Sequence, residues 1–178
     1  RMRRPWERAR KVRLLLTDVD GTLTDGRLFL LSQGEEVKGY DVKDGAGILL
    51  ARRGGIEVGF VTGKSSPGVA LRASHLGVEE LHMGVKEKVS ALEEIWARRG
   101  LTPEETLFLG DDIMDLKAME RSGLGVAVAD AHPFLRRRAD YVTQAKGGSG
   151  ALREVIEMVL ASRGGREELA LFLSRFQR

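Results

Sequence analysis

Two carboxylates lie two residues apart in Asp18-Val-Asp20, directly after the apolar run from Val12 to Leu16. Side chains alternate between the two faces of an extended strand, so Asp18 and Asp20 point in the same direction. Like charges held this close repel each other, unless a cation lies between them or one carboxyl keeps its proton and acts as an acid. Both arrangements suit phosphoryl transfer.

Three further polar groups follow other strand-like runs: Thr62-Gly63, Lys88, and the segment from Gly110 to Asp115. In a parallel α/β sheet, the loops after the carboxyl ends of the strands lie at one edge, where ligands bind. We therefore expect these groups to meet Asp18 and Asp20 in one site. Several such groups at one edge indicate a catalytic site more strongly than any of them does alone.

A carboxylate that attacks a phosphate monoester dianion meets about 4 kcal/mol of repulsion per pair of charges, at about 4 Å and an effective dielectric constant near 20. A magnesium ion held by Asp18, Asp111 and the backbone carbonyl of Asp20 would remove that repulsion. Asp18 is then predicted to be the nucleophile, which forms an aspartyl-phosphate that water hydrolyses. Asp20 is predicted to protonate the leaving alcohol and afterwards to take a proton from the water.

The remaining groups are predicted to stabilise the phosphoryl oxygens or to orient other groups. Lys88 supplies positive charge and Thr62 a hydroxyl, while Gly63 lets backbone amides approach the same oxygens. Asp112 and Asp115 are expected to orient metal-bound waters or Lys88 rather than to ligate the metal, because Mg²⁺ usually keeps several waters.

Each group also has a structural alternative when it is considered alone. Asp20-Gly21 could form a simple turn, Lys88 could face solvent on a helix, and Asp111-Asp112 could cap a helix. Thr62-Gly63 could merely end a strand. The three histidines have no metal-ligand spacing and are interpreted as surface or packing residues: His75, His82 and His132.

Apolar strand-like runs alternate with amphipathic helical runs, which indicates an α/β fold: a three-layer, doubly wound parallel sheet with helices on both faces. Strands are predicted over residues 12–17, 56–61, 80–83, 106–109 and 124–128, with a short edge strand near 141–143. Helices are predicted in the gaps. One begins at Ser66-Pro67, and another carries an apolar stripe of Val89, Leu92, Ile95 and Trp96.

Residues 27–31 and 36–40 are predicted to form a β-hairpin joined by Ser32-Gln33-Gly34-Glu35. An isolated hairpin is seldom stable, so this one should pack on another surface. Its apolar residues 28–31 suit either a second subunit or the hairpin's own domain, and the pattern alone favours neither. We expect a basic arm over residues 1–11, a catalytic domain over 12–162 with the hairpin inserted at 24–40, and a tail over 163–178.

The length and composition of the chain limit its number of domains, its cellular compartment and its partners. With 178 residues the chain fits one domain, and the absence of cysteine excludes disulfides and favours a reducing compartment. No apolar stretch is long enough to cross a bilayer, and the arm lacks the apolar stretch of a secretory signal, so we expect a cytoplasmic location and no membrane partner. The net charge of +3 comes from the arm, because the rest of the chain has 23 basic and 25 acidic residues. Nucleic acid is therefore not an expected partner.

The two ends of the chain have their own patterns. The arm is expected to be solvated, frayed or partly docked. Residues 167–177 can form an amphipathic helix with the stripe Leu169, Phe172, Leu173 and Phe176. We expect this helix to dock on its own subunit.

Taken together, these motifs resemble the haloacid dehalogenase superfamily of aspartate-nucleophile phosphatases over approximately residues 12–161. Within it, the chain is most similar to the 3-deoxy-D-manno-octulosonate 8-phosphate phosphatase family of lipopolysaccharide sugar synthesis. The matching segments are residues 18–26, 42–45, 110–115, 128–133, 139–143 and 147–154. True dehalogenases lack the second aspartate, so Asp20 indicates a phosphate substrate.

The resemblance implies an Mg²⁺-dependent phosphatase for a phosphorylated sugar acid, with 3-deoxy-D-manno-octulosonate 8-phosphate as the first candidate. It also implies a homotetramer in which the hairpins form a central barrel and each site is completed by a neighbouring subunit, whose tail visits it. This fits the chain, because neither residues 25–61 nor residues 63–88 have room for a separate cap domain. Carried over by position, the substrate-binding residues would be Asp41, Val42, Lys43, Asp44, Gly45, Gly63, Lys64, Arg72 and Lys88.

Two positions depart from the family pattern. Lys64 stands where arginine is expected, and Leu49 occupies a helix position where another arginine is frequent. Lysine cannot reproduce the bidentate fork of arginine, so a nonulosonate 9-phosphate is an alternative substrate. A phosphomutase or phosphotransferase would need a closing cap, and a non-catalytic oligomerisation module would not need clustered carboxylates.

Overall fold

The computed structural model describes residues 3–176, so residues 1–2 of the arm and 177–178 of the tail lie outside the described part. Its centre is a six-stranded sheet in the order β5-β4-β1-β6-β7-β8, and every pair in it is parallel. The strands are β1 (Leu14–Thr17), β4 (Glu57–Val61), β5 (Glu80–His82), β6 (Thr106–Gly110), β7 (Leu124–Ala127) and β8 (Tyr141–Val142). The predicted α/β class is confirmed, and each predicted strand is found to within two residues at either end.

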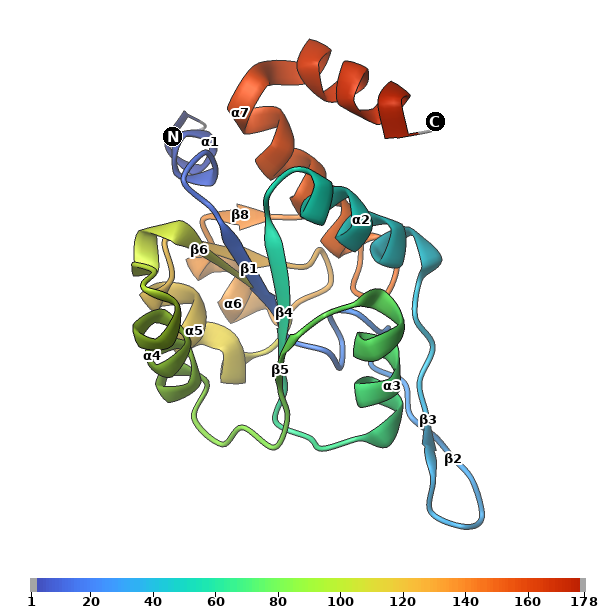
Figure 1. The fold of residues 1–178 in the computed structure, drawn as a ribbon. Helices are drawn as coiled ribbons and strands as arrows, with labels where there is room; N and C mark the ends of the chain where they lie inside the picture. Colours follow the sequence, from blue (N-terminus) through green and yellow to red (C-terminus); the bar gives the residue numbers. More distant parts are fainter. Residues whose placement is uncertain (1–2, 177–178) are drawn as a thin grey trace.

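Helices cover both faces of this sheet, with α4 and α5 on one side and α2, α3 and α7 on the other (Figure 1). The helices are α1 (Arg3–Ala9), α2 (Val42–Arg53), α3 (Pro67–Leu76), α4 (Lys88–Arg99), α5 (Leu116–Arg121), α6 (Pro133–Arg138) and α7 (Ala151–Phe176), with 3₁₀ turns η1 (Pro103–Glu105) and η2 (Ile113–Asp115). Because both faces are covered, all residues of β1 and β6 are buried, which explains why these strands are nearly continuous apolar runs.

The register of the central strands sets the positions of the loops that follow them. Thr17 of β1 is paired with Phe60 of β4 and with Leu109 of β6. The next residues along the three strands therefore leave the sheet at the same level and at the same edge. This brings the segments after β1, β4 and β6 together, as the sequence predicts.

The hairpin projects from the body of the molecule (Figure 1). Its strands β2 (Phe29–Leu30) and β3 (Glu36–Val37) pair antiparallel, which confirms the predicted hairpin. Phe29 is 60% exposed and Leu30 is 70% exposed, so the domain to which the hairpin belongs does not cover these side chains.

Both ends of the described chain pack on the same side of the molecule. Helix α1 contacts α7 and β7, and Arg8 forms an ion pair with Asp140 at 2.5 Å. Helix α7 changes direction at Gly165, where the backbone has φ +84° (Figure 1). Beyond this break Phe172 and Leu173 pack against the core, whereas the side chain of Phe176 lies outside the described part. Among the described helices, none combines the length and apolar character that crossing a bilayer requires.

Candidate active site

The loop after β1 holds Asp18 in a fixed, mostly buried position. The amide of Asp18 donates to the carbonyl of Leu109 at 3.0 Å, which continues the sheet by one residue. The loop then turns at Gly21, where φ is +82°. A Cβ at this position would lie 2.0 Å from Asp111 Oδ2, so only glycine lets the first loop approach the Asp111 carboxylate this closely.

Lys88 connects two of the predicted carboxylates. It is the first residue of α4, and its Nζ donates to Asp18 Oδ1 at 2.8 Å and to Asp115 Oδ1 at 2.5 Å. The other oxygen of Asp115 accepts the amides of Asp111 at 3.0 Å and Asp112 at 3.3 Å. Both oxygens of Asp115 therefore have partners, and one of them contacts Lys88, a contact that is compatible with the predicted orienting role.

Asp112 is placed differently from Asp115. Its carboxylate accepts the amide of Ile113 at 2.7 Å and caps the 3₁₀ turn η2. The capping alternative for Asp112 is thus realised, and its carboxylate still lies at the wall of the cavity described below.

The acidic cluster is electrostatically strained without a cation. Carboxylate oxygens of Asp18, Asp111 and Asp115 lie within 4.8 Å of one another. Burial raises the pKa of Asp18 to about 6, and Asp115 adds to this effect although Lys88 opposes it. Burial also raises the pKa of Asp111 to about 8, with further contributions from Asp115 and Asp18. A divalent cation would favour both ionised forms, and carboxylate oxygens are the ligands Mg²⁺ prefers, so these residues fit the predicted ion.

Lys88 responds to the same cluster in the opposite sense. Burial alone would lower the pKa of Lys88, but the carboxylates of Asp115 and Asp18 outweigh burial and raise it. Lys88 therefore stays positively charged beside Asp18, the predicted nucleophile, as stabilisation of a phosphoryl group requires.

These groups line a cavity of about 260 Å³ at the carboxyl ends of the strands. Besides Lys88 and the three clustered carboxylates, it is lined by the predicted residues Asp20, Thr62, Gly63, Lys64 and Asp112. Val85, Lys86 and Met114 complete the lining and were not predicted. Lys86 lies in the loop after β5, two residues before Lys88 at the start of α4, so its position along the chain could have indicated it.

Comparisons with known proteins show which family the chain resembles. A family model described as haloacid dehalogenase-like hydrolase matches residues 73–155. The 3-deoxy-D-manno-octulosonate 8-phosphate phosphatase KdsC of Escherichia coli K12 is 43% identical over 161 residues, which are 90% of this chain and 86% of the relative. The chain belongs to this phosphatase family. The enzyme of Yersinia pestis is 43% identical over 154 residues, covering 86% of this chain and 82% of the relative.

Solved structures show that the phosphatase fold extends over nearly the whole chain. The Moraxella catarrhalis 3-deoxy-D-manno-octulosonate 8-phosphate phosphatase, solved in complex with a magnesium ion, a phosphate ion and a KDO molecule, has a TM-score of 0.93 and 34% identity, covering 99% of this chain and 100% of that one. The Yersinia pestis phosphatase has a TM-score of 0.88 and 41% identity, covering 91% of this chain and 88% of that one.

Several predicted substrate-binding residues of this phosphatase lie outside the catalytic cavity of their own subunit. Asp41 caps α2 by accepting the amide of Lys43 at 2.7 Å, and Val42 is 78% exposed. Lys43 is exposed beside them. None of these three residues lines the catalytic cavity.

Asp44, Gly45 and Arg72 form a second group, in which Asp44 and Gly45 are buried and Arg72 is half-buried. Arg72 lies over the ring of Tyr40 at 5.4 Å, and Gly45 packs against the Arg72 guanidinium. Asp44 accepts the amide of Arg153 at 2.9 Å and so contacts the first turn of α7. In this subunit these three residues join α2 to α3 and α7.

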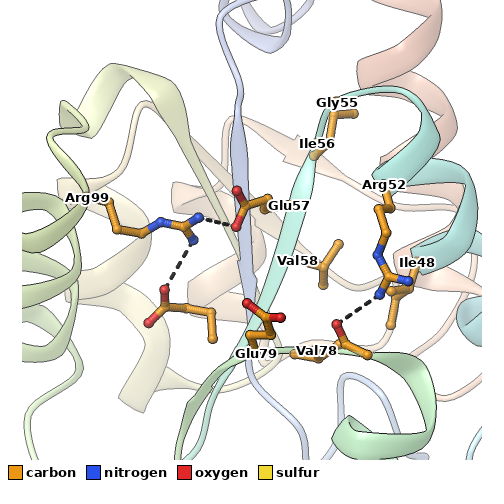
Figure 2. A pocket seen from close by; sticks show the side chains of 11 residues that line it. Ile48, Arg52, Gly55, Ile56, Glu57, Val58, Val78, Glu79 and Arg99 are labelled. Atoms are coloured by element: carbon orange, nitrogen blue, oxygen red, sulfur yellow. Dashed lines mark hydrogen bonds and ion pairs between the residues drawn. The ribbon is translucent and has the colours of Figure 1, made fainter.

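A larger hollow of about 450 Å³ lies at the opposite, amino ends of β4 and β5 (Figure 2). Four of its charged side chains, those of Arg52, Glu57, Glu80 and Arg99, have partners within the fold. Arg99 pairs with Glu57 (Figure 2) and also with Glu80. Arg52 donates to the carbonyls of Leu76 and Gly77. The chemistry of this phosphatase is therefore assigned to the smaller cavity, which contains the clustered carboxylates and Lys88.

Proposed function

We propose that this phosphatase hydrolyses 3-deoxy-D-manno-octulosonate 8-phosphate to the free sugar acid and phosphate, with Mg²⁺ as its cofactor. The observation that carries the proposal is the pair formed by the Asp18 carboxylate and the Lys88 ammonium, 2.8 Å apart beside Asp111 in one cavity. The relatives support the choice of substrate, because the Moraxella catarrhalis phosphatase was solved with magnesium, phosphate and KDO.

The proposed reaction uses the chain's own carboxylates in two steps. An oxygen of Asp18 attacks phosphorus, and the bond from phosphorus to the sugar oxygen breaks while Asp20 gives its proton to that oxygen. Water then attacks the aspartyl-phosphate, Asp20 takes a proton from the water, and phosphate leaves. Lys88 neutralises charge on the phosphoryl oxygens, with the Thr62 hydroxyl and the backbone at Gly63 beside it.

Asp18, Asp111 and the backbone carbonyl of Asp20 would hold Mg²⁺ in this site. When bound, the ion supplies the positive charge that lets an anionic nucleophile approach a phosphate dianion. Asp115 keeps Lys88 in place and Asp112 lies at the cavity wall, where it would orient water.

A second candidate substrate is a nonulosonate 9-phosphate. Lys64, which replaces an expected arginine, lines the cavity and lies 3.3 Å from Glu36. A single ammonium cannot hold a sugar-acid carboxylate with two parallel hydrogen bonds as arginine does, so Lys64 favours a different sugar acid.

The assembly that we propose is a cytoplasmic homotetramer whose hairpins form a shared barrel. The exposed apolar hairpin supports it, as does the position of Val42 and Lys43 at the surface, where they can reach a neighbour's site. Substrate-binding roles for Asp41, Asp44, Gly45 and Arg72 belong to the same proposal. The packing of Phe172 and Leu173 on their own subunit supports the expected docked tail rather than one that visits a neighbouring site.

The test is a phosphate-release assay on a panel of sugar phosphates, with and without Mg²⁺. We expect turnover of the octulosonate 8-phosphate only with Mg²⁺, no turnover by Asp18→Asn, and a kcat about 100- to 10,000-fold lower for Asp20→Asn. Glu94→Gln, a change at an exposed residue of α4, should match the wild type.

Two other results would change the proposal. A preference for a nonulosonate 9-phosphate would establish the second candidate, and equal activity on many monoesters would indicate a generalist. Undiminished turnover by both aspartate variants would contradict the assigned roles of Asp18 and Asp20.

A further inference from the structure

Lys38 is a buried ammonium in a segment that is otherwise at the surface. It directly follows β3, and its side chain is 3% exposed. Its Nζ donates a hydrogen bond to Asp20 Oδ1 and lies 3.9 Å from Glu36 Oε2. Burial of a charge without partners is costly, so these two carboxylates explain why the Lys38 ammonium can lie here.

Glu36 extends this contact to the other side of the cavity. Its Oε1 lies 3.3 Å from Nζ of Lys64, which belongs to the segment after β4 and lines the catalytic cavity. Four alternating charges therefore run from the loop after β1, through the hairpin, to the loop after β4. The hairpin therefore contacts both the loop after β1 and the loop after β4, which form two walls of the cavity.

The contact with Lys38 has a direct consequence for Asp20. The Asp20 side chain is 29% exposed, and a carboxyl this accessible can rotate among several rotamers unless a partner holds it. Lys38 engages Oδ1, which leaves Oδ2 as the oxygen able to exchange a proton with a substrate. Fixing a proton donor in one orientation accelerates proton transfer because the productive geometry is already present.

We propose that Lys38 is a positioning residue that holds the Asp20 carboxyl in the orientation needed for proton transfer, and so connects the hairpin to the chemistry. This inference rests on the proposed function, in which Asp20 protonates the leaving oxygen. Lys38 acts through Asp20 and need not touch the substrate itself.

The test compares Lys38→Met with the wild type on two kinds of monoester. A sugar phosphate leaves as an alkoxide and needs the proton of Asp20, whereas p-nitrophenyl phosphate leaves as a stable phenolate and does not. We expect kcat on the sugar phosphate to fall about 10- to 100-fold, with kcat on p-nitrophenyl phosphate changed by less than about threefold. The ratio of the two rates is independent of the folded fraction, so partial misfolding of the variant does not obscure it.

A double-mutant cycle tests whether Lys38 acts through Asp20. In the Asp20→Asn background, Lys38→Met should change kcat on the sugar phosphate by less than about twofold. Lys38→Arg keeps the positive charge and should recover part of the lost rate. Lys117→Met removes an exposed lysine of α5 and should leave the ratio of the two rates unchanged.

Equal losses on both monoesters, or additive effects in the cycle, would overturn the positioning role. The substrate proposal fails separately. If the wild type hydrolyses another sugar phosphate but not the octulosonate 8-phosphate, the proposed substrate is wrong, and the same ratio measured on the accepted sugar phosphate still decides the role of Lys38.

Discussion

At the scale of single residues, the clustered carboxylates of Asp18, Asp111 and Asp115 outnumber the Lys88 ammonium that lies among them. Asp18 and Asp115 share the Lys88 ammonium, while Asp111 has a hydrogen bond from the Thr22 hydroxyl at 3.2 Å but no ion pair within the described residues. This explains why the pKa of Asp111 is raised further than that of Asp18. The cluster is thus built to bind a cation, and its protonation should compete with metal binding.

This competition predicts a pH-dependent stabilisation by Mg²⁺. Without metal, the pKa values of Asp18 (about 6) and Asp111 (about 8) lie above their unfolded value of 3.8, so their contribution to stability is lost as pH rises from about 4 to 8. Mg²⁺ binds the ionised pair and should raise the melting temperature by about 5–10 °C at a hundredfold excess over its Kd. Differential scanning fluorimetry after chelation should show a larger increase at pH 8 than at pH 6.

The matched control for the metal is Asp111→Asn. This variant keeps the size of the side chain but removes the charge that competes with protons, so the Mg²⁺-dependent increase should largely disappear. An equal increase at both pH values in the wild type would contradict the competition between protons and metal.

At the scale of elements, Asp44 joins α2 to the start of α7. Its Oδ1 accepts the amide of Arg153, one of the first-turn amides of α7 that have no partner within that helix. The other oxygen is buried and lacks a hydrogen-bond partner. Burial therefore outweighs the amide bonds and raises the pKa of Asp44 to about 6. An uncharged acceptor would fit this position better than a carboxylate at neutral pH.

Asp44→Asn should accordingly change how stability depends on pH. The folded pKa of about 6 lies above the unfolded value of 3.8, so the wild type loses about 3 kcal/mol of unfolding free energy from this residue as pH rises from about 4 to 7.5. Asparagine keeps the acceptor oxygen and should lack this loss. Urea unfolding at both pH values measures this loss of unfolding free energy, and Glu94→Gln is the control. If the unfolding free energies of Asp44→Asn and the wild type changed in parallel with pH, the prediction would be wrong.

Local sequence patterns were sufficient to predict the helices and strands and the central residues of the site. An apolar run followed by a polar loop predicts both a buried strand and the edge at which its loop emerges, and the parallel register then brings Asp18, Thr62 and Asp111 together. The contacts of Lys38 and Asp44 have no such pattern. The Lys38 contact depends on how the hairpin folds back, and Asp44 meets an amide 109 residues away.

At the scale of the whole molecule, the hairpin exposes neighbouring apolar side chains that the rest of the described chain does not cover. Phe29 and Leu30 expose more than half of their surfaces, whereas the adjoining Lys38 side chain is buried against Asp20. The tip of the hairpin therefore suits contact with other subunits, while its base contacts the catalytic cavity. Assembly and activity should depend on each other through this one element.

The double substitution Phe29→Ser, Leu30→Ser should separate assembly from folding. Neither side chain is buried in its own subunit, so the melting temperature of the dissociated protein should keep the contribution of the core, while sedimentation should show a smaller species. Loss of the neighbour's contacts should raise KM about tenfold or more, which corresponds to about 1.4 kcal/mol of binding free energy. Phe134→Ser, which removes a 41% exposed aromatic residue of α6, is the control and should change neither sedimentation nor KM. A double variant that keeps the mass and KM of the wild type would show that the hairpin tip does not hold subunits together.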